Sequence, residues 1–265
     1  MLITGAAGLM GEQHAISILE SEGSVILTDI CEADLAKVSS KLSKSYSLKN
    51  IYKYCMDVTN IESIISVNDL IKSQSIRVDV LINNAAIDPK VNSKNDQLES
   101  TRLENFDLSQ WNLEIGVGLT GAFLCSQIFG TEMSLDDKGG IILNIASDLS
   151  VFSPDQRIYK KNKLDDRNQP VKPVTYSVIK SGLIGLTKYL STYWVDYGVR
   201  CNALSPGGIY TDQNDDFVKN IEALIPLGRM ANKDEYQAAV QFLCSDASSY
   251  MNGQNIIIDG GRSVW

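Results

Sequence analysis

Short apolar runs alternate with longer amphipathic stretches along this whole chain, and no other feature restricts its fold as much. Candidate strands are Leu2–Ile3, Val25–Thr28, Ile51–Cys55, Val80–Ile82, Ile141–Ile145, Arg200–Leu204 and Asn255–Ile258. Helical spacing is clearest over Gly11–Glu20, Leu113–Phe129, Thr175–Trp194 and Asp234–Leu243. Strand–helix alternation is typical of βαβ units, so it predicts an α/β fold with a doubly wound parallel sheet flanked by helices.

The chain contains no internal repeat or linker that would divide it. Its 265 residues, 44% of them hydrophobic, suffice for one sizeable core, and single α/β domains often reach this length. We therefore expect one domain over residues 1–265. The irregular part is 151–172, rich in charge and carrying Pro154 and Pro170, which we interpret as an inserted loop.

Composition excludes several classes of protein. A net charge of −8 disfavours binding to nucleic acid or to an anionic membrane, since both need a basic face. The five cysteines show no CxxC spacing and predict no disulfide framework, as expected in the cytoplasm. There is no signal peptide or long uninterrupted apolar span. His14 is the only histidine, so a metal site and a Ser–His or Cys–His hydrolase are disfavoured.

The first apparent strand is unusually short. Met1-Leu2-Ile3 runs directly into Thr4-Gly5, whereas strands usually have about five residues. Either this strand is short or residues upstream of Met1 are missing, and the sequence leaves both possibilities open.

A glycine-rich turn follows that strand and opens a helical stretch. Its sequence is Thr4-Gly5-Ala6-Ala7-Gly8-Leu9-Met10-Gly11. Glycines let the backbone turn tightly and approach a pyrophosphate, whose charge is favoured at the following helix N-terminus. Such turns also arise for steric reasons alone, so the motif by itself is weak.

Two aspartates strengthen a dinucleotide site. Asp29 closes the second apparent strand, where a carboxylate accepts hydrogen bonds from the adenosine ribose hydroxyls. It would repel a 2′-phosphate, which favours NAD over NADP; the alternative role is a helix cap or turn residue. Asp57 follows the third strand and fits the adenine edge, with a surface turn as the alternative.

Five further segments occur in an order that resembles the single-domain branch of the short-chain dehydrogenase/reductase family. They are Asn83-Asn84-Ala85-Ala86, Asn144-Ile145-Ala146-Ser147, Tyr176-Ser177-Val178-Ile179-Lys180, Pro206-Gly207-Gly208 with Thr211, and Asp259-Gly260-Gly261. The resemblance spans nearly the whole chain. It implies a single Rossmann-fold domain, NAD as cofactor and a homotetramer or homodimer.

The resemblance identifies Ser147, Tyr176 and Lys180 as catalytic residues. Tyr176 and Lys180 are four positions apart and share one helix face. A free tyrosine has a pKa near 10, and a neighbouring ammonium favours the phenolate. Tyr176 would then exchange a proton with the substrate oxygen, which Ser147 would hold by a hydrogen bond.

The family pattern also implies a set of cofactor-binding residues. They are Gly5, Gly8, Met10, Gly11, Asp29, Asp57, Val58, Asn84, Ala85, Ala86, Tyr176, Lys180, Pro206, Gly207, Ile209 and Thr211.

Three features depart from the family pattern. The glycine turn reads TGxxGxxG, the spacing of the extended branch, which acts on nucleotide sugars. Gly118 stands in Gly118-Leu119-Thr120-Gly121 where the family has a fourth catalytic residue, an asparagine that bends its helix and holds a water. Ser147 and Tyr176 are 29 positions apart, farther than is usual, because of the 151–172 insertion.

The insertion is locally basic, with six Lys or Arg residues against three aspartates from Asp155 to Lys172. This suggests an anionic substrate such as a phosphate or carboxylate; a solvated polar loop is the alternative. The candidate substrate contacts are Asp148, Arg157 and Lys160. The insertion, the Gly118 segment and the C-terminal DGGRSVW loosely resemble oxidoreductases of flagellin modification and surface-sugar synthesis.

We therefore predict a cytoplasmic NAD(H)-dependent oxidoreductase that interconverts a secondary alcohol and a ketone, on a sugar or sugar-derived anion. The glycine spacing keeps a sugar-nucleotide epimerase or dehydratase open as an alternative. Gly118 keeps a catalytically degenerate NAD-binding protein open as another.

Overall fold

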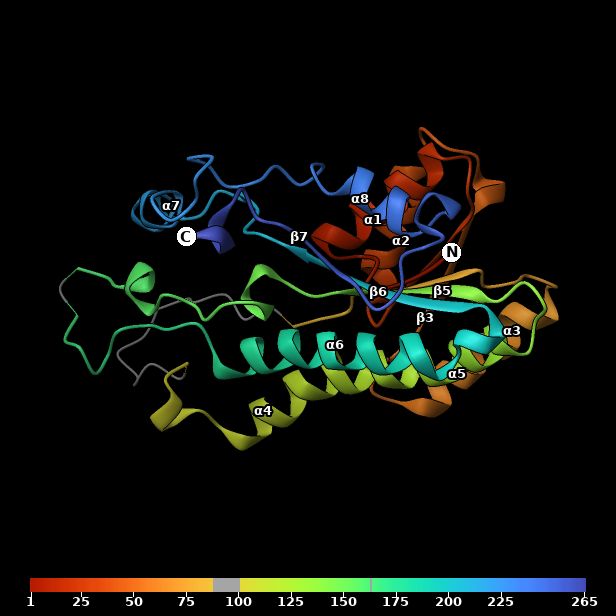
Figure 1. Cartoon of the computed structure of the whole chain (residues 1–265), viewed down its shortest axis with the longest axis horizontal. Coiled ribbons are helices and arrows are strands. Elements are labelled where there is room, and N and C mark those ends of the chain that lie inside the picture. The colour runs from red at the N-terminus through yellow and green to blue at the C-terminus, as the bar shows by residue number, and fades with distance from the viewer. Residues whose placement is uncertain (88–100, 163) are drawn as a thin grey trace.

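The computed structural model describes residues 1–87, 101–162 and 164–265, and within them seven strands form one parallel sheet (Figure 1). The strands are β1 (Leu2–Thr4), β2 (Val25–Asp29), β3 (Ile51–Cys55), β4 (Val80–Asn83), β5 (Gly140–Ile145), β6 (Val199–Pro206) and β7 (Asn255–Ile258). Their order is β3-β2-β1-β4-β5-β6-β7, and adjacent strands are parallel. The predicted doubly wound, single-domain Rossmann fold is confirmed.

Strand β1 is short but is held on both sides. Leu2 and Ile3 pair with Ile26 and Leu27 of β2, and with Leu81 and Ile82 of β4. All of these side chains are buried, because helices cover both faces of the sheet. Strands covered in this way are apolar throughout rather than alternating, which is the pattern in the sequence.

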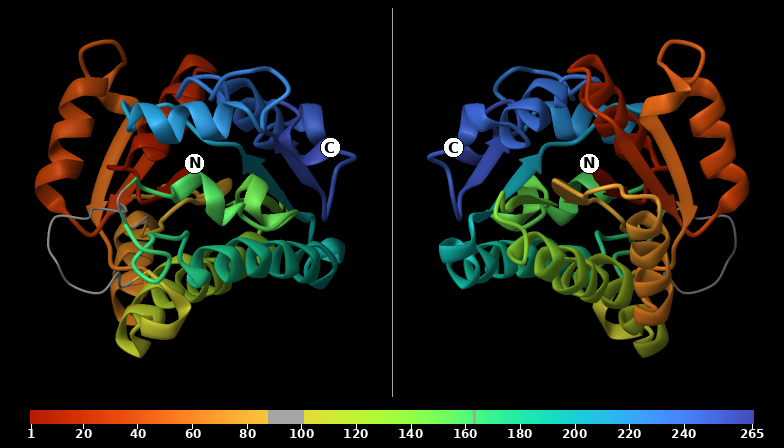
Figure 2. Two further views of the ribbon diagram at one scale, coloured as in Figure 1. Left: turned by 90° about the vertical axis from the view of Figure 1, so that its left-hand side faces the viewer. Right: turned by 90° about the vertical axis from the view of Figure 1, so that its right-hand side faces the viewer.

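Helices form a layer on each face of the sheet (Figures 1 and 2). They are α1 (Leu9–Glu20), α2 (Glu32–Leu42), α3 (Ile61–Ser73), α4 (Leu108–Ile115), α5 (Gly121–Ser134), α6 (Val174–Tyr193), α7 (Asp215–Glu222) and α8 (Gln237–Leu243). One core packs α1, α2 and α8 against the sheet. The other packs α3, α5 and α6 against the opposite face.

One predicted helix contains an irregular turn. The predicted helix Leu113–Phe129 is divided into α4 and α5 by a π-helical turn over Gly116–Thr120. Glycines at 116, 118 and 121 loosen the helix here, and π turns often occur at functional sites. The helix predicted over Asp234–Leu243 begins only at Gln237.

The stretch Leu108–Ser134 is, by length and composition alone, long and apolar enough to cross a membrane, in contrast to the prediction of no long apolar span. Cys125 and Phe129 within it are fully buried against the sheet. The stretch is thus accounted for as a core element of this fold.

The carboxyl ends of the strands meet at one edge of the sheet, on the left of Figure 1. Strand β3 is the outermost strand on one side of the sheet, and the next strand along the chain, β4, lies beside β1. The winding direction therefore reverses between β1 and β4. Ligands of doubly wound sheets bind at such a switch point. Helix α7, the insertion and the C-terminal residues lie at the same end (Figure 1).

Candidate active site

The glycine turn packs tightly against the loop after β4. Gly5 has φ +61°, and a Cβ added to it would lie 2.8 Å from Cα of Ala85. A Cβ on Gly11 would collide with the Gly5 carbonyl oxygen and the backbone of Ala6. Glycine is therefore required at both positions, which leaves backbone rather than side chains facing the switch point, as a bound pyrophosphate needs.

Asp29 reaches back to this turn. Its Oδ2 accepts a hydrogen bond from the Ala7 N–H at 3.0 Å, and its Oδ1 accepts one from the Cys31 N–H at 3.1 Å. These two bonds hold the half-buried carboxylate at the end of β2, beside the glycine turn. A carboxylate accepts more than two hydrogen bonds, so it can still receive ribose hydroxyls.

Asn84 joins the two loops at the switch point. Its side-chain amide donates to the carbonyl oxygens of Thr4 and Gly5 at 2.9 and 3.0 Å. The Thr4 hydroxyl accepts the backbone N–H groups of Asn84 and Ala85, both at 3.0 Å. His14 is fully buried in α1, and this burial lowers the pKa of its imidazole to about 4, while its interaction with the Asn84 side chain opposes the fall. The imidazole is thus neutral at pH 7 and belongs to the framework of this turn.

Asp57 lies in a turn after β3. Its Oδ1 accepts the backbone N–H and the hydroxyl of Thr59 at 2.8 and 2.7 Å, and its own N–H donates to Ser63. Val58 beside it is buried against Gly121. These bonds account for Asp57 as a turn residue, and its contact with adenine stays a prediction.

Tyr176 and Lys180 lie one turn apart on α6, which packs against the turn after β5. The Lys180 ammonium is buried; it donates to the Ile145 carbonyl oxygen at 2.8 Å and lies 5.7 Å from the centre of the Tyr176 ring. Ile145 ends β5, two residues before the buried Ser147. The structure thus anchors the predicted lysine to the strand that carries the predicted serine.

The start of α6 is held by Glu114, a residue that no sequence motif predicted. The Thr175 hydroxyl donates to the carboxylate of Glu114 on α4, and both side chains are buried. Gln110 donates to the other carboxylate oxygen at 2.6 Å. No local motif marks Glu114, because its partner lies 61 positions away.

Gly118 lies in the π turn and faces α6. A Cβ at this position would lie 2.8 Å from Cγ2 of Ile179, the residue before Lys180. The larger Ile179 therefore occupies the space in which the family's asparagine side chain would begin. The absence of a side chain at Gly118 thus leaves the space that the Ile179 side chain fills.

The two basic residues predicted to contact substrate, Arg157 and Lys160, form ion pairs with aspartates of the insertion. Arg157 forms a two-pronged ion pair with Asp155, and its side chain is 82% exposed. Lys160 pairs with Asp166 at 3.3 Å. Neither lines the cavity described next, so their contact with substrate stays a prediction that this geometry does not favour.

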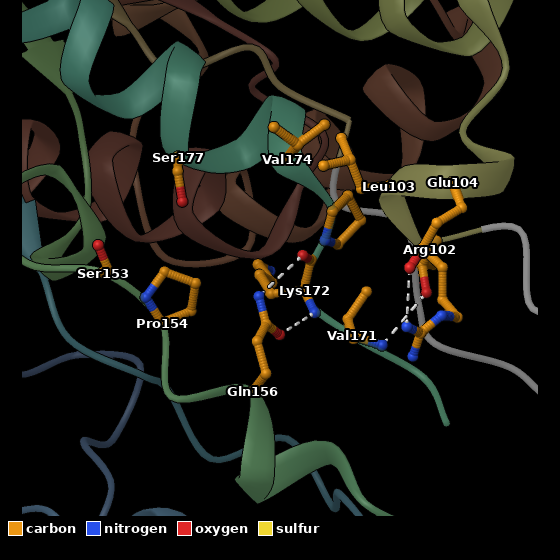
Figure 3. A pocket seen from close by; sticks show the side chains of 12 residues that line it. Arg102, Leu103, Glu104, Ser153, Pro154, Gln156, Val171, Lys172, Val174 and Ser177 are labelled. Carbon is orange, nitrogen blue, oxygen red and sulfur yellow. Dashed lines mark hydrogen bonds and ion pairs between the residues drawn. The ribbon is translucent and has the colours of Figure 1, made fainter. Parts of the chain in front are cut away.

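A cavity of about 420 Å³ opens beside the N-terminus of α6 (Figure 3). Its polar lining includes Arg102, Glu104, Gln156, Lys172 and Ser177. The Lys172 ammonium lies 3.7 Å from the centre of the Tyr176 ring. The sequence identified Lys172 only as part of the basic insertion, and it gave no signal for this contact because Lys172 precedes the first residue of α6.

The segment after β6 closes the other side of the edge. The Gly207 N–H donates to the Ile258 carbonyl oxygen, and Ile209 bridges to Ala231. A smaller cavity of about 130 Å³ adjoins Gly207. Thr211 is exposed, and its N–H donates to the Gln213 side chain. Among the described residues, no group of three or more His, Cys, Asp or Glu could hold a metal.

A backbone-lined turn at the switch point, next to a lysine–tyrosine pair, defines a dinucleotide-dependent oxidoreductase. Residues 1–160 match the family model described as short chain dehydrogenase. Residues 166–263 match the model described as Enoyl-(Acyl carrier protein) reductase. The chain therefore belongs to the short-chain dehydrogenase family.

The chain is similar to several named dehydrogenases. The chain is 31% identical to an NAD-dependent glycerol dehydrogenase of Listeria innocua, over 99% of this chain and 93% of the relative. It is 27% identical to D-threitol dehydrogenase of Mycolicibacterium smegmatis, over 99% and 92%. A Leptospira borgpetersenii short chain dehydrogenase crystallised with NAD⁺ is 33% identical, with a TM-score of 0.82 over 99% and 91%. The protein is an NAD(P)-dependent oxidoreductase acting on CH–OH groups.

Proposed function

We propose that this protein oxidises a secondary alcohol of a sugar-derived, anionic substrate to a ketone with NAD⁺, and catalyses the reverse reduction. The observation that carries the proposal is the buried Lys180 ammonium. It donates to the carbonyl oxygen of Ile145, the last residue of β5, and lies 5.7 Å from the centre of the Tyr176 ring. This geometry supports proton transfer by the tyrosine.

In this mechanism Tyr176 accepts the proton of the substrate hydroxyl. Two ammonium groups near its ring, those of Lys180 and Lys172, favour the phenolate. Ser147 donates a hydrogen bond to the substrate oxygen as negative charge develops there. Bound nicotinamide supplies the hydride acceptor. In the reverse direction Tyr176 returns the proton.

The preference for NAD is also our proposal. The residues at the switch point fit a dinucleotide, since Gly5 and Gly11 leave no room for a Cβ. Gly5, Gly8, Asn84 and Ala85 would border the pyrophosphate and ribose. The Asp29 carboxylate would bind the ribose hydroxyls and repel a 2′-phosphate.

An anionic substrate group is supported by the 420 Å³ cavity beside Tyr176. Lys172 and Arg102 line it, although Arg102 also pairs with Glu104 at 3.1 Å. The Listeria and Mycolicibacterium relatives, named for glycerol and D-threitol, support a polyol-like substrate. The role in surface-glycan or flagellin-glycan synthesis, supported by the sequence resemblance, remains part of the proposal.

We also propose a cytoplasmic homotetramer or homodimer. Supporting it, Leu113, Phe123 and Tyr189 on α4, α5 and α6 are 50%, 47% and 62% exposed. Exposed apolar side chains on these helices are compatible with burial against a protein partner. Light scattering after size exclusion tests the assembly, and a monomer at micromolar concentration would contradict it.

The decisive experiment is a turnover screen with NAD⁺ and NADP⁺, using glycerol, D-threitol, sugar phosphates and nucleotide sugars. We expect net NADH formation with a sugar-derived anion. Cofactor turnover that is internal, with product but no net NADH, would instead favour the epimerase alternative. Lys172→Ala should raise the KM for anionic substrates more than the KM for neutral polyols, whereas the loss of its charge beside Tyr176 should lower kcat for both. Lys160→Ala is the matched control on the insertion.

A further inference from the structure

An ion pair is buried next to the proposed catalytic serine. Arg262, from the C-terminal residues, donates to Oδ2 of Asp148 at 3.1 Å. The side chains are 8% and 5% exposed, and the partners are 114 positions apart. The guanidinium also stacks over Phe152, 4.9 Å from the ring centre. Burying two charges is costly unless they are paired and hydrogen-bonded.

The other oxygen of the same carboxylate holds the serine. Ser147 Oγ donates to Asp148 Oδ1 at 2.8 Å, and the Leu149 N–H donates to that oxygen at 2.8 Å. The Leu149 N–H also lies 3.3 Å from Ser147 Oγ. Each carboxylate oxygen thus has a partner, and the serine rotamer is tied to the ion pair.

The residues around Arg262 hold its side chain next to Asp148. Gly260 and Gly261 have φ of +68° and +88°, which allows a turn that other residues adopt with strain. Asp259 accepts the N–H groups of Gly261 and Ser263 at 2.9 and 2.7 Å. Beyond Arg262, the Trp265 indole donates to the Leu224 carbonyl oxygen at 3.0 Å. The turn is therefore fixed on both sides of the arginine.

We propose that Asp148 and Arg262 are positioning residues for Ser147. In the resting site Ser147 donates its single hydroxyl proton to Asp148, whose strength as an acceptor is limited by the charge of Arg262. When substrate binds, the hydroxyl turns from Asp148 and donates to the substrate oxygen. The inference rests on the catalytic role proposed for Ser147. It replaces direct substrate contact as the role of Asp148, whose side chain is buried and occupied by these partners.

The electrostatics of the pair give the proposal a measurable signature. Burial raises the pKa of Asp148, and the hydrogen bond from Ser147 and the charge of Arg262 oppose that rise. Tyr236 and Asp155 are the other titratable groups that interact with this pair. Without Arg262 the pKa of Asp148 rises further, so Asp148 takes up a proton at a higher pH.

The test compares Arg262→Met with the double variant Asp148→Asn/Arg262→Met, using D-threitol and saturating NAD⁺. Methionine keeps the packing on Phe152 and removes the charge. We expect Arg262→Met to lower kcat at pH 8 by at least about tenfold, since small displacements at a reacting centre are costly. The KM for NAD⁺ should change little. The double variant, with a neutral amide accepting from Ser147, should recover part of the loss while staying below wild type.

The pH dependence separates positioning from mere packing. The kcat of Arg262→Met, relative to wild type, should rise as the pH falls from 8 to 6, because protonation removes the unpaired buried charge. The kcat of the double variant, relative to wild type, should not depend on pH over the same range. Equal losses in both variants at every pH, or wild-type kcat in either variant, would overturn the proposal.

Thermal unfolding gives a readout that needs no substrate. A carboxyl with a raised folded-state pKa stabilises at low pH and loses that contribution as pH rises. At pH 8, Arg262→Met should therefore unfold at a lower temperature than the double variant, and this difference in unfolding temperature should become smaller toward pH 6. A difference that does not depend on pH would contradict the presence of an unpaired charge on Asp148. Arg229→Met, which breaks the exposed pair with Glu235, is the matched control.

Ser147→Ala, measured in parallel, separates the two proposals. Unchanged turnover in Ser147→Ala would contradict the proposed function. A loss in Ser147→Ala without a loss in Arg262→Met would contradict the positioning role alone.

Discussion

The two halves of the sheet edge are constructed differently. At β1, β2 and β4 the site consists of backbone, glycines and short side chains, joined by bonds such as Asn84 to Thr4 and Asp29 to Ala7. At β5 to β7 it consists of long side chains from distant segments, including Lys180, Arg262 and Lys172. The first half suits a cofactor shared by a large family, and the second suits a particular substrate.

The largest effect should come from Tyr176→Phe, which tests the substrate half. Removing the proton-transferring hydroxyl should reduce kcat by about 10²–10⁴-fold, the usual contribution of acid–base catalysis. NADH affinity, measured by fluorescence titration, should be nearly unchanged, because the cofactor half is intact. Tyr189→Phe on the exposed side of the same helix is the control. Turnover that survives in Tyr176→Phe would refute the mechanism.

Asp29→Ala tests the cofactor half, and it should weaken cofactor binding more than it lowers kcat. Losing charge-assisted hydrogen bonds of about 1.5–3 kcal/mol should raise the KM for NAD⁺ by roughly 10- to 100-fold, and kcat should fall much less. The KM for NADP⁺ should improve relative to that for NAD⁺, since the repulsion of the 2′-phosphate is gone. Asp34→Asn, at an exposed position on α2, controls for the loss of one negative charge. A wild-type preference for NAD⁺ in Asp29→Ala would overturn this interpretation.

Gly118→Asn tests the boundary between the halves. The new Cβ would meet Ile179 at 2.8 Å, and overpacking of a core typically costs about 1–3 kcal/mol. We expect a lower free energy of unfolding in urea, with partial recovery in Gly118→Asn/Ile179→Ala. Gly116→Ala, whose Cβ would lie 3.8 Å from Thr59, should be tolerated. Equal stability of Gly118→Asn and wild type would show that Ile179 moves freely.

The smallest effect concerns the framework of the cofactor half and appears only with pH. Burial lowers the pKa of His14 to about 4, whereas an unfolded histidine titrates near 6.5. The unfolded state therefore binds the extra proton between these values, and stability falls as pH falls, by about 1.4 kcal/mol per unit. His14→Gln should have a shallower slope in urea unfolding at pH 6 and 5. An unchanged slope would assign the acid sensitivity to other groups.

Local patterns were enough for the cofactor half. The glycine turn, Asp29 and Asn84 could be found because each follows a strand whose end is visible in the sequence. Lys180 could be found because a helix places it one turn from Tyr176. The exact position of the π turn at Gly116–Thr120 was not predicted, although the glycines at 116, 118 and 121 mark the segment in the sequence.

By itself, the sequence determined the parallel α/β fold through its periodicity. It also predicted the switch-point turn from its glycines, and the serine, tyrosine and lysine from their resemblance to the family's motifs. The residues of these motifs are close in the chain or lie at the ends of adjacent strands. Only the tertiary structure paired Asp148 with Arg262, turned Arg157 and Lys160 back on the insertion, and set Lys172 over Tyr176. Charge density in a sequence shows how many charges a segment carries, but the packing around each side chain decides which partner neutralises it.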